Sequence, residues 1–142
     1  MKPIPQEAHM GCAVACAASL SNLSYKKMRR YFDDGKNKEC TSGFYNRDII
    51  KALSKIKITA KAFSIKKWSN KKIKLGTIVF IRQPKVNPFG HYILKTKKGW
   101  MNPWINFPYI NPAKAGFQKI LPGQIKWVIT INKRFMRNKK QN

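Results

Sequence analysis

The hydrophobic pattern of this chain changes its period near residue 57, and the change limits the folds open to it. Before that point apolar residues recur at helical spacing, and after it they alternate or run continuously, as they do in strands. The first part predicts helices at 12–21, at 25–34 with Ser24 as N-cap, and at 44–56 with Thr41 or Ser42 as the cap.

The second part predicts a sheet. Strands are expected at 57–65, 76–83 and 125–133, and a hairpin at 91–104 that turns at the sequence KKG. Several prolines make 105–123 a surface loop. Helices followed by a largely antiparallel sheet indicate an α+β fold, with the N-terminal helices packed on the sheet. A chain of 142 residues supports one core, so we expect a single domain at 1–133 and a basic tail at 134–142.

The net charge of +25 is unevenly distributed along the chain. Residues 1–48 contain all five acids and eight of the 30 lysines and arginines, and the other 22 follow without any acid. Paired-carboxylate hydrolysis and carboxylate-rich Mg or Ca sites are therefore disfavoured. The basic part predicts an anionic partner, either nucleic acid, a lipid surface or an acidic protein such as an inhibitor or immunity partner, or else a solvated face. Its densest patch, Lys66 to Lys74, interleaves with Trp68.

Three cysteines without a repeated spacing predict no disulfide framework and favour either a reducing compartment or a free thiol. The apolar run CAVACAASL is too short to span a bilayer, and the prolines and Glu7 before it are foreign to a signal peptide. We therefore expect no signal peptide and no transmembrane segment. The expected location is the cytoplasm, or a target cell into which a secretion system delivers the protein.

Cys12 follows Gly11 at the start of the first predicted helix. The free amides and dipole of a first helical turn favour a thiolate, so the position predicts a lowered pKa and a nucleophile. Two other interpretations stay open, a buried structural cysteine and a zinc site built from His9, Cys12, Cys16 and Cys40. Otherwise Cys16 is expected to pack in the core and Cys40 to be inert.

A cysteine nucleophile needs a base, and the chain has two histidines. His9 precedes the thiol, whereas His91 follows Gly90 at the start of a strand that would hold its ring rigidly. No acid follows Asp48, so Asn102 is the best local candidate to orient His91. The side chain of Gln6 and the backbone N–H of Cys12 are candidates to bind an oxyanion. Together these residues predict acyl transfer through a thioester.

The order of these motifs resembles a known family. Gln6, five further residues, Cys12, a helix of small residues, then GHYIL, a hairpin and NPW resemble the papain-like cysteine peptidases. The likeness is closer to the bacteriocin-processing peptidases that cut after double-glycine leaders, and it spans Gln6 to Trp104. It implies Cys12 as nucleophile, His91 as base, Asn102 as orienting residue and Gln6 as oxyanion donor, with no cofactor or metal. Asn102 stands where leader peptidases usually have Asp, and no transporter domain follows.

The expected function is that of a thiol hydrolase that cleaves peptide or isopeptide amides in a peptide or protein substrate, in peptide maturation or as a toxin or effector domain. Glutamine deamidation and transglutamination use the same constellation and stay open. The alternative from another class is a basic module that binds nucleic acid or membrane and has a degenerate papain-like site.

Overall fold

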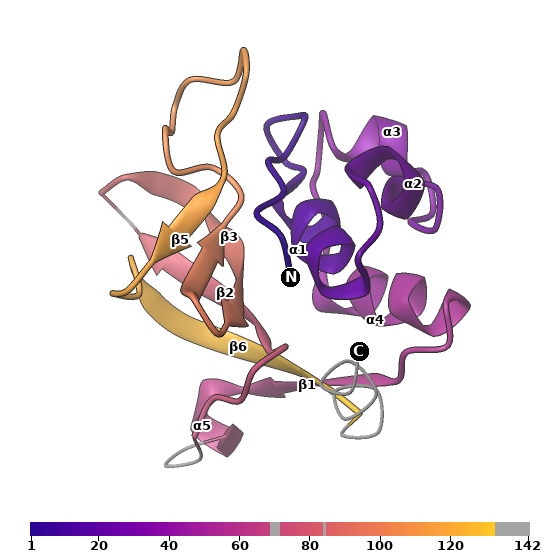
Figure 1. Cartoon of the computed structure of the whole chain (residues 1–142), viewed down its shortest axis with the longest axis vertical. Helices are drawn as coiled ribbons and strands as arrows, with labels where there is room; N and C mark the ends of the chain where they lie inside the picture. Colours follow the sequence, from indigo (N-terminus) through magenta and orange to yellow (C-terminus); the bar gives the residue numbers. More distant parts are fainter. Residues whose placement is uncertain (69–71, 84, 133–142) are drawn as a thin grey trace.

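A computed structural model describes residues 1–68, 72–83 and 85–132. The helices of the first part lie on one side of the sheet formed by the second part (Figure 1). The helices are α1 (Cys12–Ser21), α2 (Tyr25–Arg29), α3 (Gly35–Lys38), α4 (Asn46–Lys55) and α5 (Ile65–Trp68). The strands are β1 (Ala60–Ser64), β2 (Ile78–Gln83), β3 (Asn87–Thr96), β4 (Gly99–Asn102), β5 (Gly116–Gln118) and β6 (Gln124–Ile131).

Within the described residues the strands form one sheet in the order β1-β6-β2-β3-β4-β5. Every neighbouring pair in it is antiparallel, so the predicted α+β fold with helices on an antiparallel sheet is confirmed. The predicted tail at 134–142 lies outside the described residues. None of the described helices combines the length and apolar character needed to cross a membrane.

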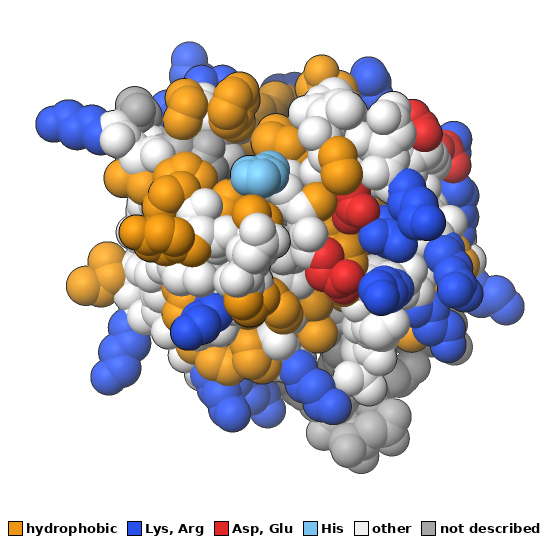
Figure 2. All heavy atoms as spheres, turned by 90° about the horizontal axis from the view of Figure 1, so that it is seen from above, with side chains coloured by type: hydrophobic (Ala, Val, Ile, Leu, Met, Phe, Trp, Pro, Cys, Tyr) orange, Lys and Arg blue, Asp and Glu red, His pale blue; other side chains and the backbone are white. Residues whose placement is uncertain are grey.

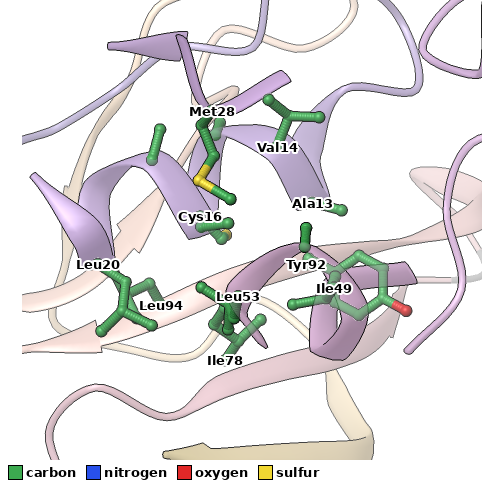
Figure 3. Packing of buried hydrophobic residues seen from close by; sticks show 14 of the residues in the cluster. Ala13, Val14, Cys16, Leu20, Met28, Ile49, Leu53, Ile78, Tyr92 and Leu94 are labelled. Atoms are coloured by element: carbon green, nitrogen blue, oxygen red, sulfur yellow. The ribbon is translucent and has the colours of Figure 1, made fainter. Parts of the chain in front are cut away.

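Helix α1 is the centre of the main core. All residues from Ala13 to Leu20 are buried, because small side chains let neighbouring elements approach from every side. In Figure 3, α1 packs with α4 and with side chains of β2 and β3. The helix ends at Ser21, and its C-cap residue Asn22 adopts a left-handed conformation with φ of 59°.

Strand β3 joins this core to a second one on the opposite face of the sheet. Tyr92 and Leu94 point into the main core, whereas Ile93 belongs to the second cluster with Val79 and Val128. Both faces of β3 are thus packed, which holds its backbone and His91 in place.

The second helix is shorter than predicted. Ser24 caps α2 as expected, since its side chain accepts the Lys27 N–H at 3.1 Å. However, α2 ends at Arg29 rather than at residue 34, because the Tyr31 N–H donates to the Met28 carbonyl, only three residues back. The chain then turns into α3 through Asp34, with φ of 53°.

Helix α4 starts at Asn46, so the predicted cap at Thr41 or Ser42 was wrong. The carboxylate of Asp48 instead accepts the Tyr45 N–H at 2.7 Å. Strand β5 also departs from the prediction, because it lies inside the expected loop at 105–123. Its three residues are too few to show an alternating pattern.

Candidate active site

Cys12 begins α1, as predicted, and its sulfur lies against β3. The backbone amides of Tyr92, Ala13 and Cys12 donate hydrogen bonds that favour the thiolate. Cys12 remains partly accessible to solvent, but the protein packed around its sulfur raises the thiol pKa to about 11, because burial outweighs these amides. The predicted lowered pKa was therefore wrong, and the resting group at neutral pH is a thiol.

His91 pairs with Asn102 inside the protein. The His91 Nε2 and Asn102 Oδ1 atoms are 2.7 Å apart, and both side chains are buried. The Trp104 backbone N–H also donates to this oxygen, at 2.9 Å. Because the Asn102 oxygen can only accept, His91 Nε2 carries the proton and Nδ1 carries a lone pair. Burial lowers the pKa of His91, and the Asn102 hydrogen bond opposes that shift, so the ring is neutral at neutral pH.

Gln6 is connected to the turn that follows Asn102. Its backbone N–H donates to the Pro103 carbonyl at 3.2 Å, and the His9 ring meets the Trp104 ring edge-on at 5.8 Å between centroids. The buried Gln6 Nε2 donates to the carbonyls of Ala8 and His9, each at 3.0 Å. One of these hydrogen bonds must be exchanged before Nε2 can donate to an oxyanion, and the role of Gln6 stays a prediction.

A buried polar network supports the loop in front of Cys12. The Tyr25 hydroxyl donates to Glu39 Oε2 at 2.6 Å, and Arg29 pairs with Glu39 Oε1 at 2.8 Å. The Glu7 backbone amide reaches the Tyr25 oxygen, and Met10 N–H donates to the Glu39 carbonyl at 2.9 Å. The network thereby attaches residues 7–10 to α2 and to the residue after α3.

Gly11 is needed for space beside this network. A Cβ at Gly11 would lie 2.1 Å from the Tyr25 hydroxyl oxygen. Its φ is −92°, which other residues also adopt, so glycine is needed here because Tyr25 approaches closely.

The zinc alternative finds no support in the geometry. Among the described residues no three His, Cys, Asp or Glu side chains gather closely enough to hold a metal ion, and all four proposed zinc ligands are described. Cys16 is buried in the core as predicted, and Cys40 is exposed.

Figure 2 views the end of the molecule that lies at the top of Figure 1. Hydrophobic side chains gather over much of this face, and its acidic side chains lie on the helical side. The segment between β4 and β5 contributes Ile105, Phe107 and Tyr109, all exposed. Phe107 packs on Trp104, so the apolar surface continues to the candidate site.

Sequence reasoning found four candidate residues and missed the contacts that support them. The backbone N–H of Trp104 donates to the Asn102 oxygen, a contact that no local motif indicated. Gln118, which accepts from Asn102, and the Tyr25–Glu39 pair carried no local signal. Their partners lie 14 or 16 positions away along the chain.

A helix that begins with cysteine, packed beside an antiparallel sheet that carries a histidine–asparagine pair, has the architecture of a papain-like fold. Two solved structures share it. The peptidase domain of Streptococcus ComA, described as a bi-functional ABC transporter involved in a quorum-sensing pathway, superposes with a TM-score of 0.57 at 14% identity, over 90% of this chain and 95% of that one. The peptidase domain of Streptococcus mutans ComA gives a TM-score of 0.50 at 14% identity, over 93% and 99%.

No family model and no curated protein matches the chain. The two structures therefore show the fold that this chain shares with ComA peptidase domains, and they leave its activity to be argued from the site.

Proposed function

We propose that this protein is a cysteine peptidase that cleaves peptide or isopeptide amide bonds, with Cys12 as nucleophile and His91 as base. The observation that carries the proposal is the buried His91–Asn102 pair. This hydrogen bond leaves the lone pair of His91 Nδ1 available. The next residue on β3, Tyr92, directs its backbone N–H to the Cys12 sulfur.

The chemistry starts from two neutral groups. His91 Nδ1 takes the thiol proton while the sulfur attacks the substrate carbonyl, and the C=O electrons move onto oxygen. The Cys12 backbone N–H and Gln6 Nε2 are the proposed donors to that oxyanion, the latter after releasing a loop carbonyl. His91 then protonates the leaving amine as the C–N bond breaks, which leaves a thioester on Cys12. Water, activated by the same nitrogen, hydrolyses the thioester and frees the thiol.

Asn102 keeps the imidazole in place through both steps. Its oxygen accepts from Nε2 whether the ring is neutral or protonated, so it stabilises the imidazolium as that forms. An amide does this without a negative charge, which suits a chain that has no acid after Asp48.

The substrate proposed for this site is a peptide with apolar side chains, because the surface beside the site exposes Ile105, Phe107 and Tyr109. Of the two settings considered, peptide maturation and action as a toxin domain, the first is favoured. One solved structure that shares the fold is the peptidase domain of a transporter involved in a quorum-sensing pathway.

A peptide library derived from a cellular proteome tests the proposal. We expect the wild-type protein to generate new peptide ends, and Cys12→Ser to generate none while its circular dichroism is unchanged. The matched control is Cys40→Ser, which changes an exposed cysteine and is expected to retain cleavage. Cleavage that persists in Cys12→Ser would reject the assignment. Glutamines converted to glutamate or joined to amines, without cleavage, would identify a deamidase or transglutaminase on the same site.

A second proposed function, binding to an anionic polymer such as nucleic acid, follows from how the charges are paired. In the described part of the chain, every ion pair uses an acid that precedes α4 or lies in its first turn: Asp33, Glu39 and Asp48. The lysines and arginines of the sheet have no acid near them in sequence to neutralise them. Their field favours phosphate groups. An acidic lipid surface and an acidic inhibitor are the other proposed partners of this charge.

A further inference from the structure

Gln118 makes the remaining hydrogen bond of the Asn102 side chain. Its Oε1 accepts from Asn102 Nδ2 at 3.0 Å. In the antiparallel β4–β5 pair, Asn102 lies opposite Gly116 and Trp100 lies opposite Gln118. Gln118 is therefore the diagonal neighbour of Asn102 on the same face of the sheet. The strand missed by sequence reasoning thus brings a side chain to the candidate site.

The backbone of Gln118 also packs closely against Gly99. Gly99 begins β4 with φ of 111°, and a Cβ there would lie 2.7 Å from the Gln118 carbonyl oxygen. The turn between β3 and β4 therefore uses glycine both for its conformation and for the approach of β5. This contact fixes where Gln118 stands relative to the hairpin that carries His91 and Asn102.

An asparagine amide serves His91 in only one of its two orientations. Its oxygen accepts from His91 Nε2 and from the Trp104 N–H. Turned around, Nδ2 would face the Trp104 donor and would force the His91 ring to present its lone pair on Nε2. Asn102 is buried, so Nδ2 needs a protein acceptor in the orientation that serves His91. Gln118 Oε1 is that acceptor.

We infer that Gln118 is a positioning residue that fixes the Asn102 amide and, through it, keeps the His91 proton on Nε2 and the lone pair on Nδ1. The inference rests on the proposed function, in which Nδ1 takes the thiol proton. Gln118 acts through Asn102 and not on the substrate. Residues that hydrogen-bond to the partner of a functional histidine commonly orient its ring in this way.

Nitrogen NMR of the two histidine rings tests the inference without any substrate. The wild-type His91 is expected in the single tautomer protonated on Nε2, with His9→Asn used to assign the signals. Gln118→Leu removes the acceptor at similar size and should give a mixture of tautomers. Gln118→Glu retains an acceptor and should keep the single tautomer. The matched control Gln124→Leu changes an exposed glutamine of β6 and should leave the His91 signals unchanged.

Kinetics on a cleaved peptide give the second readout. Loss of one hydrogen bond predicts a kcat roughly 2- to 12-fold lower in Gln118→Leu. KM should be unchanged, because the proposed role of Gln118 is exerted through Asn102. Gln118→Glu should restore kcat. A wild-type tautomer together with a wild-type kcat in Gln118→Leu would overturn the inference.

If Gln118→Leu does not fold, the Gln118→Glu variant provides the test of the inference. Its new carboxylate beside Asn102 should raise the pKa of His91 in an NMR titration, and an unchanged pKa would overturn the inference. The two proposals also fail separately. If the His91 tautomer depends on Gln118 but the protein cleaves no peptide, the proposed function is rejected and the positioning role of Gln118 is retained.

Discussion

At Cys12, burial and hydrogen bonding act on the thiol in opposite directions. Three backbone amides favour the thiolate, but burial is the larger effect and raises the pKa to about 11. His91 is shifted the other way, since burial lowers its pKa. Both shifts favour the uncharged forms, so at rest Cys12 is a thiol and His91 a neutral imidazole.

This predicts how Cys12 reacts with iodoacetamide. At neutral pH alkylation should be slow, and it should accelerate about tenfold per pH unit up to a pH of about 11, because only the thiolate reacts. Intact-mass spectrometry of the Cys40→Ser variant measures the alkylation of Cys12, because the one other remaining cysteine, Cys16, is buried. A fast rate that stays constant from about pH 5 to about pH 8 would instead indicate a thiolate–imidazolium pair.

At the scale of elements, the start of α1 depends on α2. The Tyr25 hydroxyl fills the space where a side chain at position 11 would stand, and it also binds Glu39. Tyr25 thus connects the loop that carries Gln6 with the helix that carries Cys12.

Gly11→Ala should therefore destabilise the fold by roughly 1–3 kcal/mol through overpacking. Tyr25→Phe should cost about 1.5–3 kcal/mol, because it removes a hydrogen bond to a buried carboxylate. The two changes should not add, since Tyr25→Phe removes the oxygen that would lie 2.1 Å from the new Cβ. Urea unfolding of the four combinations measures this coupling, and strictly additive free energies would contradict the contact.

The parts predictable from the sequence were those with local signals. The small-residue helix after Gly11 and the hairpin after Gly90 both formed, and they brought His91 and Asn102 together as the resemblance implied. The Gln118 and Glu39 contacts could not be predicted, because each joins separate elements and depends on the final packing. The predicted direction of the Cys12 pKa shift was wrong for the same reason, because the sequence shows where the helix starts but not how deeply the sulfur is buried.

At the scale of the whole molecule, charge and chemistry are divided between two layers. The helical layer supplies Cys12 and the acids of the ion pairs, and the sheet supplies His91 and Asn102. Most of the lysines and arginines follow α4 in the sequence, where no acid remains. A substrate at the site would therefore contact both layers.

The charge predicts that binding to nucleic acid, if it is selected, weakens steeply with salt. The logarithm of the association constant should fall linearly with the logarithm of salt concentration, with a slope of about −0.7 for each phosphate neutralised on a single strand. Fluorescence anisotropy with a labelled oligonucleotide measures this slope, and vesicles with and without acidic lipid test the membrane alternative. Affinity that does not change with salt would leave only a solvated basic surface.

The most direct test of the central claim, that Cys12 attacks with the help of His91, is acylation by p-nitrophenyl acetate, because this ester needs no specific peptide recognition. We predict a burst of nitrophenol and an acetyl group located on Cys12 by tandem mass spectrometry. Cys12→Ser should show no burst, and His91→Gln should both acylate and hydrolyse the thioester slowly. Acetyl groups spread over the lysines, at a rate unchanged in Cys12→Ser, would contradict the account.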